Sequence, residues 1–137
     1  MPQVTFDNIY NYFNVCDNIS VVYGNNLYSL SQDNVLNIQN LLFYLCNNSH
    51  EMPAIGVSIH NETIKAMRTG MWLKLKYNTT LSHNGMSFDE LIININSNDY
   101  GFNIIRGNNG VYDGRCYYVS LEKNIVELYN TLLNMIN

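Results

Sequence analysis

Cys116 is the side chain in this sequence with the most favourable neighbours for covalent chemistry. The adjacent Arg115 would favour the thiolate form, and His83 falls in the same predicted sheet, so a Cys–His pair for nucleophilic catalysis is one interpretation. Strand alternation, however, places Cys116 with Tyr118 on the apolar side of the sheet, where a small thiol commonly packs as an inert core residue. An enzyme that uses Cys116 or a histidine is therefore the second alternative to the functions considered below.

The other candidate sites lack essential parts. Cys46 and His50 lie four positions apart, but a structural zinc site needs four ligands and no second pair accompanies them. Residues 106–110 contain glycines without the Gly-Lys-Ser/Thr ending of a phosphate-binding loop. Asp89 and Glu90 are adjacent, so on a strand they would point to opposite sides and could not act jointly on one proton. We therefore predict a protein that is not an enzyme and holds no metal and no cofactor.

The composition is typical of a single globular domain over residues 1–137. Apolar residues make up 47% and charged residues only 13%, so uncharged polar groups, chiefly Asn, must cover the surface. The three cysteines are odd in number and widely spaced, which does not fit a disulfide framework. The first residues do not resemble a secretory leader, and no apolar run is long enough to span a membrane. We therefore expect a cytoplasmic protein that does not act at membranes.

The cations are confined to one part of the chain. The net charge is −4, and the first 64 residues contain five acidic residues and no Lys or Arg. An anionic group should therefore bind to the second half. The overall acidity excludes non-specific binding to duplex DNA, which requires a dense basic surface. The seven cations are Lys65, Arg68, Lys74, Lys76, Arg106, Arg115 and Lys123.

The first third of the chain predicts two helices and a hairpin. Apolar residues within 5–15 follow helical spacing, with Thr5 as the N-cap. Two short apolar runs within 19–30 flank a Gly-Asn-Asn turn, which is typical of a β-hairpin. Ser31 or Asp33 would then cap a helix whose apolar stripe continues to residue 45.

The next segment is less regular. Residues 54–59 follow a proline and read as a strand. Residues 62–69 fit a short helix with Gly70 in the left-handed position directly after it, and a second hairpin is the alternative.

Residues 71–119 are predicted to form the central sheet of the protein. Alternating apolar and polar residues form four strands separated by turns rich in Asn, Asp and Gly, and consecutive tight turns imply an antiparallel meander. Residues 121–136, capped by Ser120, form a closing helix with a narrow apolar stripe. This stripe could cover the sheet or form a dimer seam, since its spacing is close to a heptad. The predicted fold is therefore α+β: an antiparallel β-meander with helices packed on one face.

Alternation along these strands predicts two different faces. Leu73, Leu91, Ile93 and Cys116 should belong to the core. Aromatic rings and cationic groups should face outward, an arrangement that suits the acidic surface of a protein or a nucleotide-like ligand. The predicted binding residues are Trp72, Lys74, Lys76, Phe88, Arg106, Arg115 and Tyr117.

Small size, acidity and the lack of catalytic motifs together favour a function in binding. We expect a small non-enzymatic binding or inhibitor protein, of the kind that phages and mobile elements encode, which occupies the surface of a host protein. The alternative is a protein that sequesters a nucleotide-like or other anionic small molecule against Trp72, Arg106 and Arg115. An interface between copies of the chain, such as a homodimer, is one place where this ligand could bind.

Overall fold

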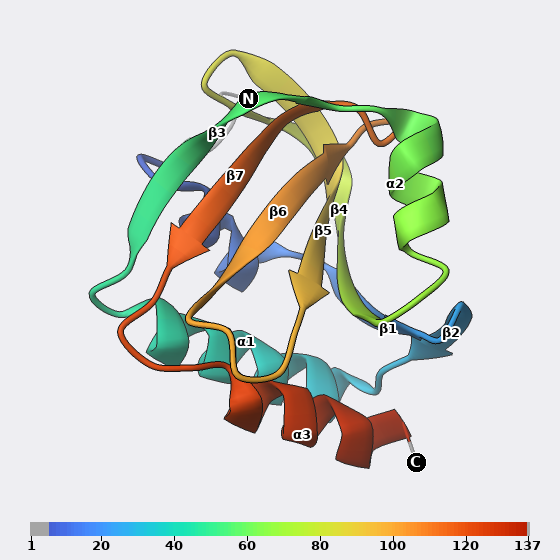
Figure 1. Ribbon diagram of the computed structural model, residues 1–137, viewed down its shortest axis with the longest axis vertical. Helices are drawn as coiled ribbons and strands as arrows, with labels where there is room; N and C mark the ends of the chain where they lie inside the picture. The colour runs from blue at the N-terminus through green and yellow to red at the C-terminus, as the bar shows by residue number, and fades with distance from the viewer. Residues whose placement is uncertain (1–5, 137) are drawn as a thin grey trace.

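The computed structural model describes residues 6–136, and the side chains of residues 53–58, 114 and 115 lie outside this description. Its strands are β1 (Asn18–Tyr23), β2 (Asn26–Ser29), β3 (His50–Ser58), β4 (Met71–His83), β5 (Met86–Ile95), β6 (Gly101–Gly107) and β7 (Gly114–Ser120). Its helices are the 3-10 helix η1 (Ile9–Val15) and the α-helices α1 (Gln32–Cys46), α2 (His60–Ala66) and α3 (Val126–Ile136). The strands form one antiparallel sheet in the order β2-β1-β4-β5-β6-β7-β3 (Figure 1), so the predicted α+β class with its antiparallel meander is confirmed.

Tight turns with left-handed residues join the hairpins as the sequence indicates. Gly24 and Asn25 have φ angles of 57° and 69° between β1 and β2, and Asn84 and Gly85 have φ angles of 52° and 79° between β4 and β5. Hairpin turns of this kind need positive φ at both central positions, which Asn and Gly adopt at low cost. Both predicted hairpins are therefore confirmed.

The helix α1 is also confirmed, together with its N-cap. The side chain of Ser31 accepts a hydrogen bond from the backbone N–H of Asn34 at 3.2 Å, which satisfies one of the donors left open at a helix start. Val35, Ile38 and Leu42 point from this helix into the core.

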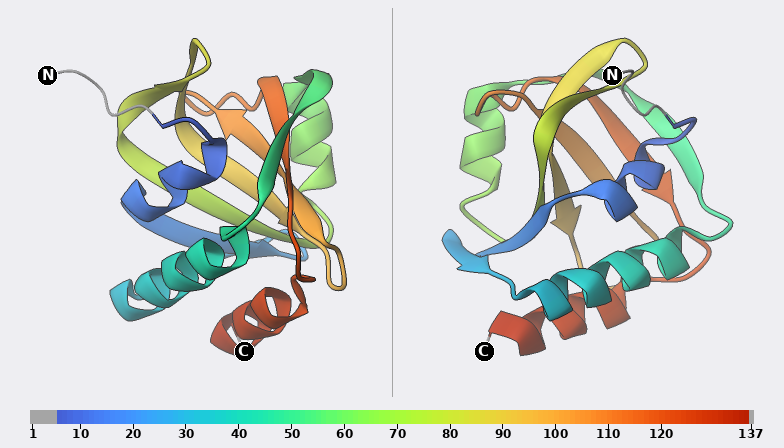
Figure 2. Two further views of the ribbon diagram at one scale, coloured as in Figure 1. Left: turned by 90° about the vertical axis from the view of Figure 1, so that its left-hand side faces the viewer. Right: turned by 180° about the vertical axis from the view of Figure 1, so that it is seen from behind.

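The main core lies on one face of the sheet, which η1, α1 and α3 cover (Figure 2). Leu73, Leu91 and Ile93 are buried there, as predicted. Leu128 and Leu132 of α3 are fully buried in the same cluster. The stripe of the closing helix therefore covers the sheet, and its interpretation as a dimer seam is wrong. None of the helices within residues 6–136 is long and apolar enough to cross a membrane.

The closing helix is shorter than the predicted range 121–136, because the residues before it bind another segment. The backbone N–H groups of Leu121 and Ile125 donate hydrogen bonds of 2.9 Å to carbonyl oxygens of the turn between β5 and β6. These N–H groups hold the chain in an irregular conformation until residue 126. The predicted cap, Ser120, is instead the last residue of β7.

Two other helices differ in detail from the predictions. The first is a 3-10 helix that begins at Ile9, and its predicted cap Thr5 lies outside the described residues. The second, α2, is a helix rather than a hairpin, but it ends at Ala66. Gly70 is therefore not directly after the helix. With φ of 77° it forms the turn into β4, where its carbonyl accepts a hydrogen bond from Gly24.

Candidate functional site

The face of the sheet opposite α1 and α3 carries a second, smaller hydrophobic cluster. It consists of Val22, Met67, Trp72, Ile92 and Tyr112. Met67 directly follows α2, so this helix lies on the opposite face of the sheet from the other three (Figure 1). Two hollows open on this face, one on each side of the cluster.

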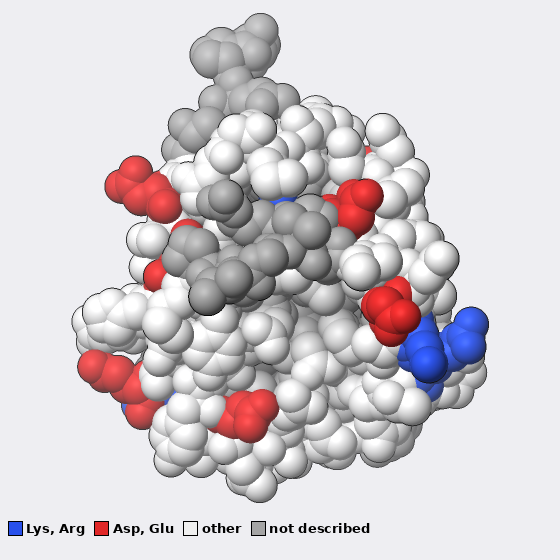
Figure 3. All heavy atoms as spheres, turned by 45° about the horizontal axis from the view of Figure 1, so that its top comes forward, with Lys and Arg blue, Asp and Glu red and all other residues white. Residues whose placement is uncertain are grey.

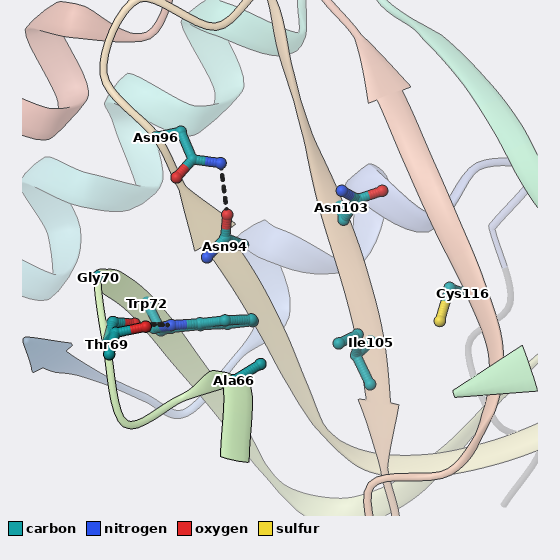
Figure 4. A pocket seen from close by; sticks show the side chains of 9 residues that line it. All are labelled: Ala66, Thr69, Gly70, Trp72, Asn94, Asn96, Asn103, Ile105 and Cys116. Atoms are coloured by element: carbon teal, nitrogen blue, oxygen red, sulfur yellow. Dashed lines mark hydrogen bonds between the residues drawn. The ribbon is translucent and has the colours of Figure 1, made fainter. Parts of the chain in front are cut away.

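The first hollow, called the Trp72 pocket here, has a volume of about 490 Å³ (Figure 4). Trp72 forms one wall, but only 6% of its surface is exposed, so it does not face solvent as predicted. Its indole N–H donates a hydrogen bond of 2.9 Å to the carbonyl of Thr69, which fixes the ring. Ile105 and Cys116 lie across from it on β6 and β7 (Figure 4). The other lining residues are Ala66, Thr69, Gly70, Asn94, Asn96 and Asn103.

Three asparagine side chains give the Trp72 pocket its polar groups. The amide of Asn96 donates a hydrogen bond of 2.6 Å to the side-chain carbonyl of Asn94 (Figure 4). Whichever amide donates in this pair, one N–H₂ group and one carbonyl oxygen remain available to a ligand. Asn103 extends from the neighbouring strand and is exposed. The pocket therefore offers neutral donors and acceptors beside a flat aromatic ring.

The second hollow, called the Glu90 hollow here, has a volume of about 630 Å³ and contains two of the predicted cations. The ammonium groups of Lys74 and Lys76 lie 4.0 and 3.5 Å from Oε1 of Glu90. Lys74 also lies over the ring of Tyr112, at 6.0 Å from its centre. Burial and a hydrogen bond with Glu90 raise the pKa of Tyr112. Asp89, at the rim, accepts a hydrogen bond from the backbone N–H of Asn109.

Phe88 does not face outward as predicted. It is fully buried in the main core, whereas Glu90, two positions later, lies on the other face. The cause is a register shift between β4 and β5, where Lys76 pairs with Glu90 but Leu81 pairs with Phe88. Four residues of β4 therefore oppose a single residue of β5, and this bulge breaks the alternation on which the prediction depended.

The alternation predicted for β7 is inverted. Tyr117 pairs directly with Ile104, and directly paired residues point to the same face of a sheet. Since Ile104 is buried in the main core, Tyr117 is buried there too, and Cys116 lies in the Trp72 pocket. The predictions of an outward Tyr117 and a core Cys116 are therefore both wrong.

Arg106 is also buried, with 2% of its surface exposed, so it does not face a partner as predicted. It pairs with Leu91, whose side chain lies in the core, and its guanidinium lies 5.7 Å from the centre of the Tyr117 ring. The side chain of Arg115 lies outside the described residues, so its binding role stays a prediction.

The structure does not bring Cys116 and His83 together. His83 is buried on the core side, in edge contact with the ring of Tyr117 and 3.5 Å from Oε1 of Glu51. The same carboxylate accepts a hydrogen bond from the backbone N–H of Ile9. Cys116 is on the opposite face, so this histidine cannot activate it. Among the side chains that the structure describes, no three His, Cys, Asp or Glu residues are placed to hold a metal ion.

Sequence reasoning missed the three asparagines of the Trp72 pocket. Asn is frequent in this sequence, so the residue type alone gives no functional signal. The available signal was the position of the asparagine along its strand, since Asn94 lies directly opposite Trp72 in the β4–β5 pairing. Tyr112 was missed as well, because it stands in an irregular connection where no alternation applies.

The surface charge is uneven around this face. In the view of Figure 3, Lys and Arg atoms gather at the side of the molecule that carries α2, whereas Asp and Glu atoms are scattered. The exposed cations of α2 and the turn after it are Lys65 and Arg68. Comparisons with protein families, with curated proteins and with solved structures found no match to this chain.

Proposed function

We propose that the protein is a non-catalytic cytoplasmic binding protein, and that the Trp72 pocket holds a small molecule with a nucleobase-like ring. The observation that carries this proposal is the combination of a fixed indole ring with three asparagine amides in one open pocket. Sequestration of such a molecule needs no catalytic group, which agrees with the sequence-based prediction of a non-enzymatic protein.

The chemistry of the pocket suits a planar, neutral and polar ring. Stacking on a fully open aromatic face is worth about 1–3 kcal/mol per base, and the small exposed part of Trp72, 6% of its surface, offers a fraction of that contact. An asparagine amide can pair with the edge of a base through one donor and one acceptor, as in the recognition of adenine. The Asn94–Asn96 pair presents both kinds of group, and Asn103 offers a third amide from β6.

Trp72 provides a direct test, because it is the only tryptophan in the chain and it lines the pocket. Titration with the four common ribonucleosides should change its fluorescence saturably for at least one of them. Asn103→Ala should weaken that binding, whereas Asn37→Ala, at an exposed position of α1, should not. If no nucleoside changes the fluorescence or the melting temperature at millimolar concentration, the proposal is wrong.

A second candidate function, inhibition of a host protein by surface binding, is favoured by the outer side of α1. Leu36 and Phe43 are two helical turns apart and are 56% and 66% exposed. Exposed apolar residues in such an arrangement can anchor a protein partner. A partner recovered stoichiometrically by the wild type should be lost with Leu36→Ser and Phe43→Ser together, and retained with Asn103→Ala. Equal recovery by all three proteins would exclude this surface.

A further inference from the structure

We infer that two copies of the chain pair through the outer side of α1 and form a symmetric, antiparallel dimer. The contact surface, called the α1 stripe here, consists of Leu36, Asn40, Phe43 and Asn47. All four residues are exposed, and none of them lines the Trp72 pocket. The inference therefore goes beyond the proposed function and does not depend on it.

The α1 stripe has the spacing of a seam between two helices. Its residues are separated by four, three and four positions, so they align along one side of α1. The core-facing side of the helix is a different one, where Val35, Ile38 and Leu42 are buried. A surface helix usually has one apolar side and a charged or polar side opposite to it. Instead, α1 has a second, partly apolar stripe that its own fold leaves exposed.

The surface around the α1 stripe contains no charged residue. Residues 34–49 include no Asp, Glu, Lys or Arg, although seven of them are exposed. Depletion of charge together with exposed aromatic residues is typical of the centre of a protein interface. The nearest charged residues lie at the two ends of α1, with Asp33 at its start and Glu122 and Lys123 beside Tyr44 at its end. They fit the polar rim of such an interface.

A second copy of the chain is the partner that this surface fits. In a two-fold symmetric interface the same surface meets itself, so each charge within it would face a like charge. The α1 stripe avoids this repulsion because its polar residues are asparagines. An asparagine amide both donates and accepts hydrogen bonds, so two such amides can pair with each other. The stripe is therefore complementary to itself.

The antiparallel orientation follows from the order of the residues along the stripe. When Leu36 of one copy lies against Phe43 of the other, the two Asn40 side chains meet near the two-fold axis. A buried asparagine in such a seam fixes the register of paired helices. A parallel pair would instead bring the two Asp33 carboxylates together and align the two helix dipoles unfavourably.

Sedimentation velocity from micromolar to millimolar concentration tests for the dimer. The wild type should change from monomer to dimer within this range, because one helix face buries less than the standard interface of about 1,600 Å². Leu36→Ser together with Phe43→Ser should weaken association by about a hundredfold, since two apolar side chains lose their burial. Leu27→Ser is the matched control, because Leu27 is an exposed leucine of β2 outside the stripe.

Asn40→Asp distinguishes a second copy from a foreign protein as the partner. In the dimer this substitution places two carboxylates near the axis, so it should weaken association by about tenfold or more. Asn61→Asp adds the same charge at an exposed position of α2, on the opposite face of the sheet, and should leave the dimer unchanged.

Cross-linking tests the orientation. After oxidation, a mixture of Leu36→Cys and Phe43→Cys should contain more disulfide-linked dimer than either variant alone. The wild type gives the background from Cys116, which is partly exposed.

Several outcomes would overturn the inference. A chain that stays monomeric at millimolar concentration does so, as does a dimer that survives Asn40→Asp or the double serine variant. A monomer that captures a foreign protein through Leu36 and Phe43 overturns it in favour of the second candidate function. Stronger cross-linking of Leu36→Cys alone than of the mixture overturns the antiparallel arrangement. None of these results changes the nucleoside titration, which tests the Trp72 pocket separately.

Discussion

His60 and Tyr112 stack with their ring centres 5.6 Å apart, and Nδ1 of His60 accepts a hydrogen bond of 3.0 Å from the backbone N–H of Tyr112. This contact joins the start of α2 to the connection between β6 and β7, across 52 positions of sequence. Because Tyr112 lines the Glu90 hollow, the contact also fixes one wall of that hollow.

We expect His60→Ala to loosen the connection between β6 and β7. The substitution removes both the stacking and the hydrogen bond, so backbone amides around Tyr112 should exchange with solvent faster. Hydrogen exchange measured by mass spectrometry tests this. His50→Ala is the control, since His50 is exposed at the start of β3. Equal protection of residues 108–113 in wild type and His60→Ala would show that the contact does not hold this segment.

We expect Gly107→Ala to destabilise the fold because the ring of Tyr112 lies directly on Gly107. A Cβ at this position would come within 2.7 Å of the ring. Overpacking of this kind typically costs about 1–3 kcal/mol, which urea denaturation would measure as a lower free energy of unfolding. The cost should fall markedly when Tyr112 is already Ala, because the two residues then no longer collide. An equal cost in both backgrounds would contradict the contact.

We expect alkylation to distinguish Cys116 from the other two cysteines. Burial raises the pKa of Cys16 to about 11 and that of Cys46 to about 12, so neither forms much thiolate near neutral pH. Cys116 is partly exposed in the Trp72 pocket. With iodoacetamide at pH 8, mass spectrometry should find Cys116 modified first, and all three modified in urea. A bound ligand should slow the reaction of Cys116. Comparable native labelling of Cys46 would contradict the assigned burial.

We expect stability to fall as the pH rises above about 9. The native thiols of Cys16 and Cys46 stay protonated to about pH 11 and 12, whereas the unfolded chain loses these protons from about pH 9. The unfolded state then binds fewer protons, so the free energy of unfolding decreases by up to about 1.4 kcal/mol per pH unit for each thiol. Urea denaturation at pH 8 to 10 measures this slope. Cys46→Ala should make the slope shallower, and an unchanged slope would contradict the role of Cys46.

The parts of the fold that depend on local patterns were predictable. Asn-Gly turns define the hairpins, and the spacing of apolar residues with the Ser31 cap defines α1. The place of β3 was not predictable in this way, because it pairs with β7, more than fifty positions later, rather than with a neighbour in sequence. The start of α3 was missed for the same reason, since a distant turn binds the backbone of residues 121–125.

The candidate site was predicted in part. Trp72, Lys74 and Lys76 lie on one face because β4 is regular over this stretch. Phe88 and Tyr117 were misplaced because simple alternation does not anticipate a bulge or fix the phase of a strand that follows an irregular connection. Side chains alternate between the two faces of a strand, so an error of one residue in the alternation assigns every side chain to the wrong face.

The position of β3 at the far edge of the sheet has a consequence for synthesis of the chain. A ribosome releases residues 50–58 long before residues 114–120, the strand with which they pair. Until then β3 has no strand with which to pair, because β7 is its partner in the sheet. Contacts between segments so distant in sequence slow folding. The nascent chain should therefore complete its sheet only after β7 has left the ribosome, and a truncation before β7 should leave an aggregation-prone intermediate.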